Sequence, residues 1–189
     1  AAVYIDGSVT PPAFDDSPDF LLHFNESYQE CFGESVQLNG CYGFENGKFD
    51  KAFRSKYGNL IFENASALKF GTGDFTVDFW AKFESSGSSY YIFENGTPSS
   101  SDYFRMSLNG DELRFYCGPS SAMATIDANI AFNTWYHIAI VRAGNRVLVY
   151  VNGTLRLNFV NTSNLNAGGD LYIGSAKNNE GNYFRGLID

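Results

Sequence analysis

Histidine and cysteine are scarce in this sequence, which limits the kinds of site that the chain can form. The two histidines are His23 and His137, and the three cysteines are Cys31, Cys41 and Cys117. None of them stands at the short spacings that zinc knuckles or redox pairs use, so we expect no metal or redox role from them. Cys31 and Cys41 flank a polar segment and are able to form a disulfide in an oxidising compartment. Sequence alone leaves the bridge and the free thiols as alternatives, because spacing does not fix disulfide geometry.

Long apolar runs and basic clusters are also missing. The longest apolar runs, such as 138–141 and 147–151, are far shorter than the about 20 residues of a membrane-spanning helix. The 13 Lys and Arg are outnumbered by 21 Asp and Glu, which gives a net charge of -8 and a pI near 4.7. No basic patch is available to neutralise a phosphate backbone. We expect a soluble chain that neither inserts in a membrane nor binds nucleic acid.

The start of the chain shows no secretion signal, because it has no basic segment followed by an apolar one. We therefore expect a mature form or a fragment. Its 189 residues suffice for one domain with a substantial core. Residues 1–19 contain most of the prolines and several Asp and Ser, which predicts an extended lead-in or linker before a domain over 20–189.

Aromatic residues and turn formers are abundant, with 18 Phe, 12 Tyr and 19 Gly. This balance favours short strands joined by tight turns. Strand-like runs separated by Gly, Asn, Ser and Asp occur at 19–24, 59–63, 75–83, 90–94, 103–117, 124–130, 133–157 and 171–176. The polar, Gly-rich stretch 25–47 is expected to form long loops with at most one short strand.

Three dipeptides predict hairpin turns: Asn109-Gly110, Gly144-Asn145 and Asn152-Gly153. Asn-Gly most favours a type I′ turn, because both residues tolerate positive φ. Residues 133–157 then form an antiparallel meander of three strands. The runs 138–141 and 147–151 are apolar on both faces, which predicts a sheet buried on both sides. A curved sandwich of two sheets, an all-β fold, is the simplest architecture.

The run 75–83 alternates in character, so its two faces are predicted to differ. We expect one face to point into the core and the other to carry Asp78, Trp80 and Lys82. The core-facing residues are Phe75, Val77, Phe79, Ala81 and Phe83.

Catalytic residues are not evident. His137 shares a strand face with Trp135, Ala139 and Val141, which favours a structural role over a catalytic base, and His23 is interpreted in the same way. Glycoside hydrolysis is the more serious enzyme hypothesis, since it needs two carboxylates about 5 to 9 Å apart. Asp74 and Asp78 share a face but are separated by about 13 Å of extended chain. The strand-borne Glu-x-Asp-x-x-Glu pattern of glucanases is absent. We expect no enzymatic activity.

A sugar-binding site is easier to support, because sugar recognition uses aromatic faces beside amide and carboxylate groups. The segments 85–104 and 175–184 offer that mixture on predicted loops. The candidate ligand-binding residues are Tyr90, Tyr91, Tyr103, Asn178, Asn179, Asn182 and Tyr183. The alternative is that these tyrosines are partly buried strand residues and these asparagines are turn formers.

Five Asn-x-Ser/Thr sequons are present, and they matter only in a host that glycosylates asparagine. They begin at Asn25, Asn64, Asn95, Asn152 and Asn161. Asn152 is better explained by its hairpin turn.

Several blocks, in this order, resemble the laminin-G-like branch of the concanavalin A-like lectin/glucanase superfamily. They are LLHFNES (21–27), GKFDKAF (47–53), LKFGTGDFTVDFWAKF (68–83), WYHIAIVRAGNRVLVYVNGTL (135–155) and LYIGSAKNNEGNYFRGLID (171–189). The resemblance implies a jelly-roll antiparallel β-sandwich that serves adhesion or carbohydrate binding without catalysis. Some members of the family bind calcium at a loop edge, so the resemblance leaves calcium possible, but its ligands are not assigned to residues here and no other cofactor is expected.

The opening LLHF and the FGTGDFTVDFW segment are similar in particular to laminin-G-like domains of tailed-bacteriophage virion proteins. Related domains occur in secreted bacterial adhesins. The resemblance implies a module on the virion surface, in a tail fibre or on a capsid, or alternatively a secreted, extracellular one. Its partner would be a cell-surface glycan or a neighbouring virion protein, and it is compatible with a homo-oligomer.

The end of the chain also resembles the family, whose members continue from FRGLID into a closing strand. Here nothing follows Asp189. We expect a longer polypeptide, or another chain that supplies the pairing, because an unpaired sheet edge invites association. Leu187 and Ile188 are expected to begin a strand near the FLLHF segment.

Overall fold

The computed structural model describes residues 2–5, 20–23, 29–30, 36–65, 68–85, 90–97, 100–118, 123–126, 128–166, 169–177 and 181–189. Every named element in this part is a β-strand, which confirms the predicted all-β class, and no helix in it is long and apolar enough to cross a membrane. The strands are β1 (Ala2–Ile5), β2 (Phe20–His23), β3 (Gln29–Glu30), β4 (Val36–Asn46), β5 (Lys51–Phe62), β6 (Phe75–Phe83), β7 (Tyr90–Asn95), β8 (Phe104–Asn109), β9 (Glu112–Cys117), β10 (Met123–Ile126), β11 (Trp135–Ala143), β12 (Arg146–Val151), β13 (Thr154–Val160), β14 (Leu171–Ile173) and β15 (Gly186–Ile188).

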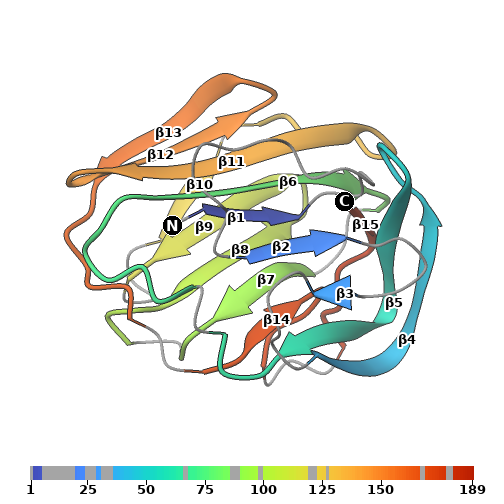
Figure 1. Ribbon diagram of the computed structural model, residues 1–189. Coiled ribbons are helices and arrows are strands. Elements are labelled where there is room, and N and C mark those ends of the chain that lie inside the picture. Colours follow the sequence, from blue (N-terminus) through green and yellow to red (C-terminus); the bar gives the residue numbers. More distant parts are fainter. Residues whose placement is uncertain are drawn as a thin grey trace.

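The strands form two layers that share the long strand β5 (Figure 1). In one layer the order is β13-β12-β11-β6, followed by β15 and the first half of β5. In the other layer the second half of β5 pairs with β14, and β7, β8, β9 and β10 follow. β4 pairs with β5 over its whole length, and the curved β4–β5 hairpin lies at the right edge of Figure 1.

Aromatic side chains fill the space between the layers. The Phe79 ring of β6 meets the Phe93 ring of β7 edge-on at 5.9 Å between centroids, although these two strands are not neighbours in a sheet. Phe75 and Phe104 make a similar contact at 5.7 Å. Burial of such rings is the main stabilising term of the fold. The core therefore lies between the β6 layer and the β7–β8 layer.

The predicted faces of β6 are confirmed. Phe75, Val77, Phe79, Ala81 and Phe83 are all buried, and the residues between them are half-buried. The same alternation in β11 and β12 corrects another prediction, because the runs 138–141 and 147–151 are buried on only one face. Their other face keeps part of its surface in solvent, so apolar content on both faces did not mean burial on both.

The hairpin turns follow the predicted positions with one exception. Asn152 and Gly153 both have positive φ, 50° and 74°, as a type I′ turn requires. Gly144 and Asn145 connect β11 to β12, with Gly144 at φ 59°. Between β8 and β9 the pairing of Asn109 with Glu112 places Gly110-Asp111 in the turn, one residue later than predicted.

The prediction of long loops over 25–47 is wrong for its second half. Val36–Asn46 form β4, a strand of 11 residues, and β5 begins at Lys51 rather than at Asn59. A long partner explains this strand, because main-chain pairing with β5 stabilises a polar sequence that has little strand preference of its own.

The two ends of the described chain meet β6 on the same side. β1 pairs in parallel with residues 76–79, so this part of the predicted lead-in belongs to the sheet. Leu187 and Ile188 lie in a strand, as predicted, but the predicted neighbour is wrong: β15 lies between β5 and residues 81–83 of β6. β2 joins the sheet through β1 instead. β6 is long enough to pair with both short strands in succession.

Candidate functional site

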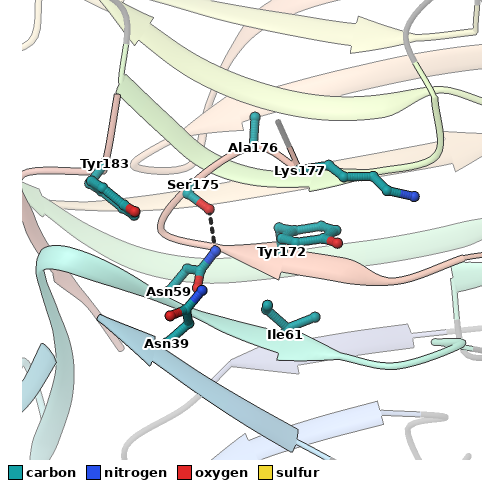
Figure 2. A pocket seen from close by; sticks show the side chains of 8 residues that line it. All are labelled: Asn39, Asn59, Ile61, Tyr172, Ser175, Ala176, Lys177 and Tyr183. Carbon is teal, nitrogen blue, oxygen red and sulfur yellow. Dashed lines mark hydrogen bonds between the residues drawn. The ribbon is translucent and has the colours of Figure 1, made fainter. Parts of the chain in front are cut away.

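A cavity of about 160 Å³ opens between the β4–β5 hairpin, β14 and the segment that follows β14. Figure 2 shows its lining, with Tyr183 on one side and Tyr172 on the other of a hydrogen-bonded Asn59–Ser175 pair. The lining residues are Asn39, Asn59, Ile61, Tyr172, Ser175, Ala176, Lys177 and Tyr183.

Strand register brings these residues together from distant parts of the sequence. Asn39 in β4 lies opposite Asn59 in β5, so the two side chains share a face of the sheet. Ile61, two residues after Asn59, points to the same face and pairs with Tyr172 of β14. The floor of the cavity is therefore one face of three adjacent strands.

The base of the cavity carries two buried polar side chains. Asn59 is 6% exposed and Ser175 is 1% exposed. The Asn59 amide Nδ2 donates to Ser175 Oγ at 2.5 Å. The Asn59 Oδ1 has no hydrogen-bond partner within the described part of the chain.

The wall formed by 175–177 is fixed from behind by a buried acid. The backbone N–H of Lys177 donates to Glu94 Oε1 at 2.9 Å, and Glu94 Oε2 accepts from the Tyr103 hydroxyl at 2.6 Å. Arg105 forms an ion pair with Glu94 at 3.7 Å and packs on the Tyr116 ring at 3.9 Å. Burial, and then the bond to Glu94, raises the pKa of Tyr103. Tyr103 therefore stays a neutral donor to Glu94.

Tyr172 presents a half-buried ring to the cavity. Its hydroxyl donates to Asp170 Oδ2 at 3.3 Å. Partial burial raises the pKa of Tyr172, and the charge of Asp170 adds to that effect. The ring therefore remains a neutral aromatic surface with a polar tip, which suits contact with a sugar.

The structure places the predicted site residues in three groups. Tyr183 lines the cavity and Asn182 lies beside it, half-buried, with its carbonyl accepting from the Tyr91 N–H at 3.3 Å. Asn178 and Asn179 lie outside the described residues. Tyr90 and Tyr91 lie in β7 and are buried, which agrees with the predicted strand over 90–94 and with the alternative of strand tyrosines, and not with a place on an exposed loop.

Tyr103 is also buried, and not exposed to a ligand as its choice as a candidate requires. It stands one residue before β8 and is fully buried, so no ring surface is left to meet a ligand. Its partner Glu94 explains the burial, because the hydrogen bond between them satisfies the phenol inside the protein.

Several lining residues were missed by sequence reasoning. Ser175 and Lys177 fall within the predicted segment 175–184, and Tyr172 lies in a predicted strand, but none was singled out. Asn39 and Asn59 carry no local signal, since only the register of β4 against β5 joins them.

His137 lies away from this cavity, on the outer face of β11. Its Nε2 is 3.4 Å from Asp78 Oδ2, and its ring lies 5.3 Å from the Trp80 ring across the strand pair. Its backbone N–H donates to Asn152 Oδ1 at 2.9 Å, which ties the strand to the hairpin turn. These contacts favour the structural role that the sequence predicted.

The described part of the chain contains no group of three or more His, Cys, Asp or Glu side chains able to bind a metal ion. Calcium ligands stay unassigned. Cys117 is a buried free thiol, and its burial raises its pKa to about 12. The predicted alternative of a Cys31–Cys41 disulfide involves Cys31, which lies outside the described residues. Among the sequons, Asn95 and Asn161 are buried, Asn64 and Asn152 are exposed, and Asn25 lies outside the description.

Solved structures of similar fold include two kinds of protein. One is domain 4 of AbnA, a GH43 extracellular arabinanase from Geobacillus stearothermophilus, in complex with arabinotriose. It shares 19% identity at a TM-score of 0.67, and the match covers 87% of this chain and 85% of that chain. Another is botulinum neurotoxin type C, whose cell entry depends on interaction with two ganglioside molecules. It shares 15% identity at a TM-score of 0.63, and the match covers 89% of this chain and 46% of that chain. A third structure is the binding domain of botulinum neurotoxin DC in complex with SialylT, at 15% identity and a TM-score of 0.64. The match covers 89% of this chain and 46% of that chain.

At these identities the likeness shows a shared fold, and the chain spans about half the length of the toxin chains. The predicted concanavalin A-like, jelly-roll-type class is thereby confirmed. No curated protein gives a significant match. The family model described as "Concanavalin A-like lectin/glucanases superfamily" matches residues 55–189, well over half of the sequence. The chain belongs to the concanavalin A-like lectin/glucanases superfamily, in its laminin-G-like group.

Proposed function

We propose that this domain is a non-catalytic glycan-binding module and that the cavity between Tyr172 and Tyr183 is its binding site. The observation that carries the proposal is the lining itself. Two aromatic rings flank buried amide and hydroxyl groups, the combination with which proteins bind the apolar faces and hydroxyls of sugars.

The similarly folded proteins support a glycan as the ligand. One of them is in complex with arabinotriose, one with SialylT, and one depends on gangliosides for cell entry. These ligands differ from one another, so they favour the ligand class and not a particular sugar.

The size and composition of the cavity support binding without catalysis. Its volume of about 160 Å³ is below the about 300–1,000 Å³ of pockets that enclose a drug-sized ligand, so it suits one sugar unit of a longer glycan. None of the described lining residues is Asp or Glu. Glycoside hydrolysis ordinarily uses two such carboxylates on either side of the bond that breaks.

The biological location of the module is proposed on the sequence resemblance alone. We propose a virion surface, in a tail fibre or on a capsid, or alternatively a secreted adhesin. None of the similar structures named above is a virion protein. Attachment to cell-surface glycans is compatible with either setting, and neighbouring virion proteins or further copies of the chain would be the protein partners.

A glycan array followed by calorimetry tests the proposal. We expect saturable retention of a glycan, and about tenfold weaker binding for Tyr172→Ala and for Tyr183→Ala, since a lost aromatic contact is worth about 1 to 1.5 kcal/mol. Tyr150→Ala is the matched control, because Tyr150 is a half-buried tyrosine of β12 in the other layer. Unaltered binding in both cavity variants, or no retained glycan, would contradict the proposal. Release of new reducing ends from the retained glycan would overturn its non-catalytic part.

A further inference from the structure

The base of the cavity contains a buried hydrogen-bond acceptor without a partner. Asn59 is 6% exposed, its Nδ2 is bonded to Ser175, and its Oδ1 has no partner among the described residues. Leaving a buried carbonyl oxygen unpaired is unfavourable, so native proteins pair nearly all such groups. Asn59 is one of the residues that line the cavity, so a ligand seated at the base lies next to the side chain whose oxygen lacks a donor.

A hydrogen-bond donor lies beside this acceptor. The Ser175 hydroxyl accepts from Asn59, and within the described part of the chain it donates to no neighbour. A hydroxyl has one proton to donate as well as lone pairs to accept. The base therefore offers one acceptor, Asn59 Oδ1, and one donor, Ser175 O–H, on two side chains in direct contact.

Only some chemical groups complement such a pair. A carboxylate only accepts and an ammonium only donates, whereas a hydroxyl does both through a single oxygen. Resting on the proposed glycan binding, we infer that Asn59 and Ser175 select one sugar hydroxyl, which donates to Asn59 Oδ1 and accepts from Ser175 Oγ. The two residues thus determine which hydroxyl pattern the cavity takes, and the tyrosines supply the apolar contact.

The backbone fixes both side chains before a ligand arrives. Asn59 lies in the paired part of β5, opposite Asn39. Ser175 follows Gly174, which has φ 88° and whose N–H donates to the Ile92 carbonyl at 2.8 Å. A side chain at Gly174 would meet Ser55 Oγ at 3.1 Å and the Phe53 ring at 3.2 Å, so the close packing here depends on glycine. A prearranged donor and acceptor lose little entropy on binding.

Substitutions in the protein give the first test of the inference. Their effect on affinity is measured by calorimetry, with arabinotriose and a sialylated oligosaccharide as probes. We expect Asn59→Ala to weaken binding about tenfold or more, and Ser175→Ala about threefold to tenfold. Asn161→Ala is the matched control: Asn161 is 7% exposed, donates to the Cys117 carbonyl at 2.7 Å and does not line the cavity. It is expected to lower the melting temperature while leaving affinity within twofold.

Monodeoxy analogues of the probe that binds test the ligand side. We expect one deoxy position to weaken binding to the unaltered protein about tenfold or more, and to weaken binding to Asn59→Ala less than twofold. If Asn59→Ala fails to fold, the analogue series on the unaltered protein and on Ser175→Ala decides the matter.

Two failures are distinguishable. If a glycan binds and depends on Tyr172 and Tyr183, but no single hydroxyl depends on Asn59, water alone satisfies the pair and this inference is wrong while the proposed function stands. If neither probe nor any glycan on the array binds, the proposed function fails and this inference fails with it.

Discussion

The two faces of the β6–β11 strand pair differ in burial and in the kind of side chain that they carry. On the inner face Phe79 lies opposite Ile138, and both are almost fully buried. On the outer face Trp80 lies opposite His137, with Asp78 next to them, and all three side chains keep some exposure. Apolar burial is worth about 25 cal/mol per Å², whereas exposed polar pairs contribute about 0 to 1 kcal/mol. The inner face therefore supplies stability, and substitutions on the outer face are expected to cost far less.

Arg142 breaks this division, because it is a charged residue on the inner face in line with Ile138 and Ile140. It is 2% exposed, and burial lowers the pKa of its guanidinium without removing the charge. Its guanidinium donates to three backbone carbonyls: Gly71 at 2.6 Å, Gly73 at 2.7 Å and Ser163 at 2.9 Å. One side chain thus fixes two loops at the end of the sandwich.

The largest effect is expected for Arg142→Ala. It removes the guanidinium donor from three carbonyls, of which Gly71 keeps the Leu165 N–H, and it opens a cavity beside Phe75, so the free energy of unfolding should fall by about 5 kcal/mol. Arg142→Lys keeps the charge, but a single nitrogen cannot reach all three carbonyls, and about 2 to 3 kcal/mol should be lost. Urea unfolding of both variants measures this. A loss below about 2 kcal/mol for the alanine variant would show that the loops do not depend on the arginine.

Phe79→Ala comes next, with an expected loss of about 3 to 5 kcal/mol as a core cavity. Phe79 is 1% exposed and meets Phe93 across the two layers. Thr76→Ala in the same strand, on the outer face, is the control and should cost less than about 1 kcal/mol. Denaturant unfolding compares the two. Equal losses would mean that the faces of β6 do not differ in the way that their burial indicates.

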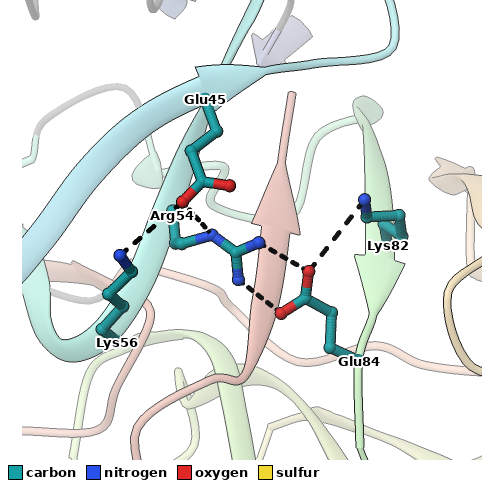
Figure 3. Close-up of polar contacts among 5 residues, drawn as sticks. All are labelled: Glu45, Arg54, Lys56, Lys82 and Glu84. Carbon is teal, nitrogen blue, oxygen red and sulfur yellow. Dashed lines mark hydrogen bonds and ion pairs between the residues drawn. The ribbon is translucent and has the colours of Figure 1, made fainter.

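Glu84→Gln tests the charged network near the outer face, which Figure 3 shows around Arg54. The Arg54 guanidinium bonds Glu84 on one side, with one contact of 2.7 Å, and forms an ion pair with Glu45 on the other at 2.6 Å. The bond to Arg54 lowers the pKa of Glu84 below its ordinary value of 4.5, while the Glu84 carboxylate raises the pKa of Arg54. The variant should lose about 1 to 2 kcal/mol at pH 7, since the pair is partly exposed.

The sign of the pH dependence follows from the lowered pKa of Glu84. The carboxylate is favoured in the folded protein, so its contribution is complete above pH 4.5 and is lost as the pH falls through the depressed pKa. The stability difference between the unaltered protein and Glu84→Gln should therefore shrink toward zero in acid. Glu45→Gln, at a more exposed carboxylate, should show a smaller difference at pH 7. A difference that stays constant from pH 7 down into the acid range would contradict the role given to this pair.

Local patterns predicted the parts of the fold that local forces determine. The alternation in 75–83 gave the buried face of β6, and Asn152-Gly153 gave a type I′ turn, because each depends on only a few consecutive residues. β4 was missed, since its pairing with β5 and not its own composition makes it a strand. The position of β15 was missed for the same reason, because strand order is a property of the whole sheet.

The candidate site shows the same limit. Tyr183 was predicted because it stands in a segment rich in aromatic and amide side chains, and it lines the cavity. Asn39 and Asn59 meet only through the register of β4 against β5, so no local pattern pointed to them. Tyr103 was a candidate for ligand contact, but it lies in the interior, where its hydroxyl donates to Glu94.

The smallest effect is expected for His137→Gln, which tests the outer face most directly. The His137–Asp78 contact of 3.4 Å joins side chains that are 32% and 26% exposed, so its loss should change the free energy of unfolding by no more than about 0.5 kcal/mol. The backbone bond from His137 to Asn152 does not depend on the side chain and should survive the substitution. Glycan retention should stay within twofold of the unaltered protein, because His137 does not line the cavity. Calorimetry on the folded variant decides: abolished binding with unaltered stability would move the functional site from the cavity to the outer face of β6 and β11.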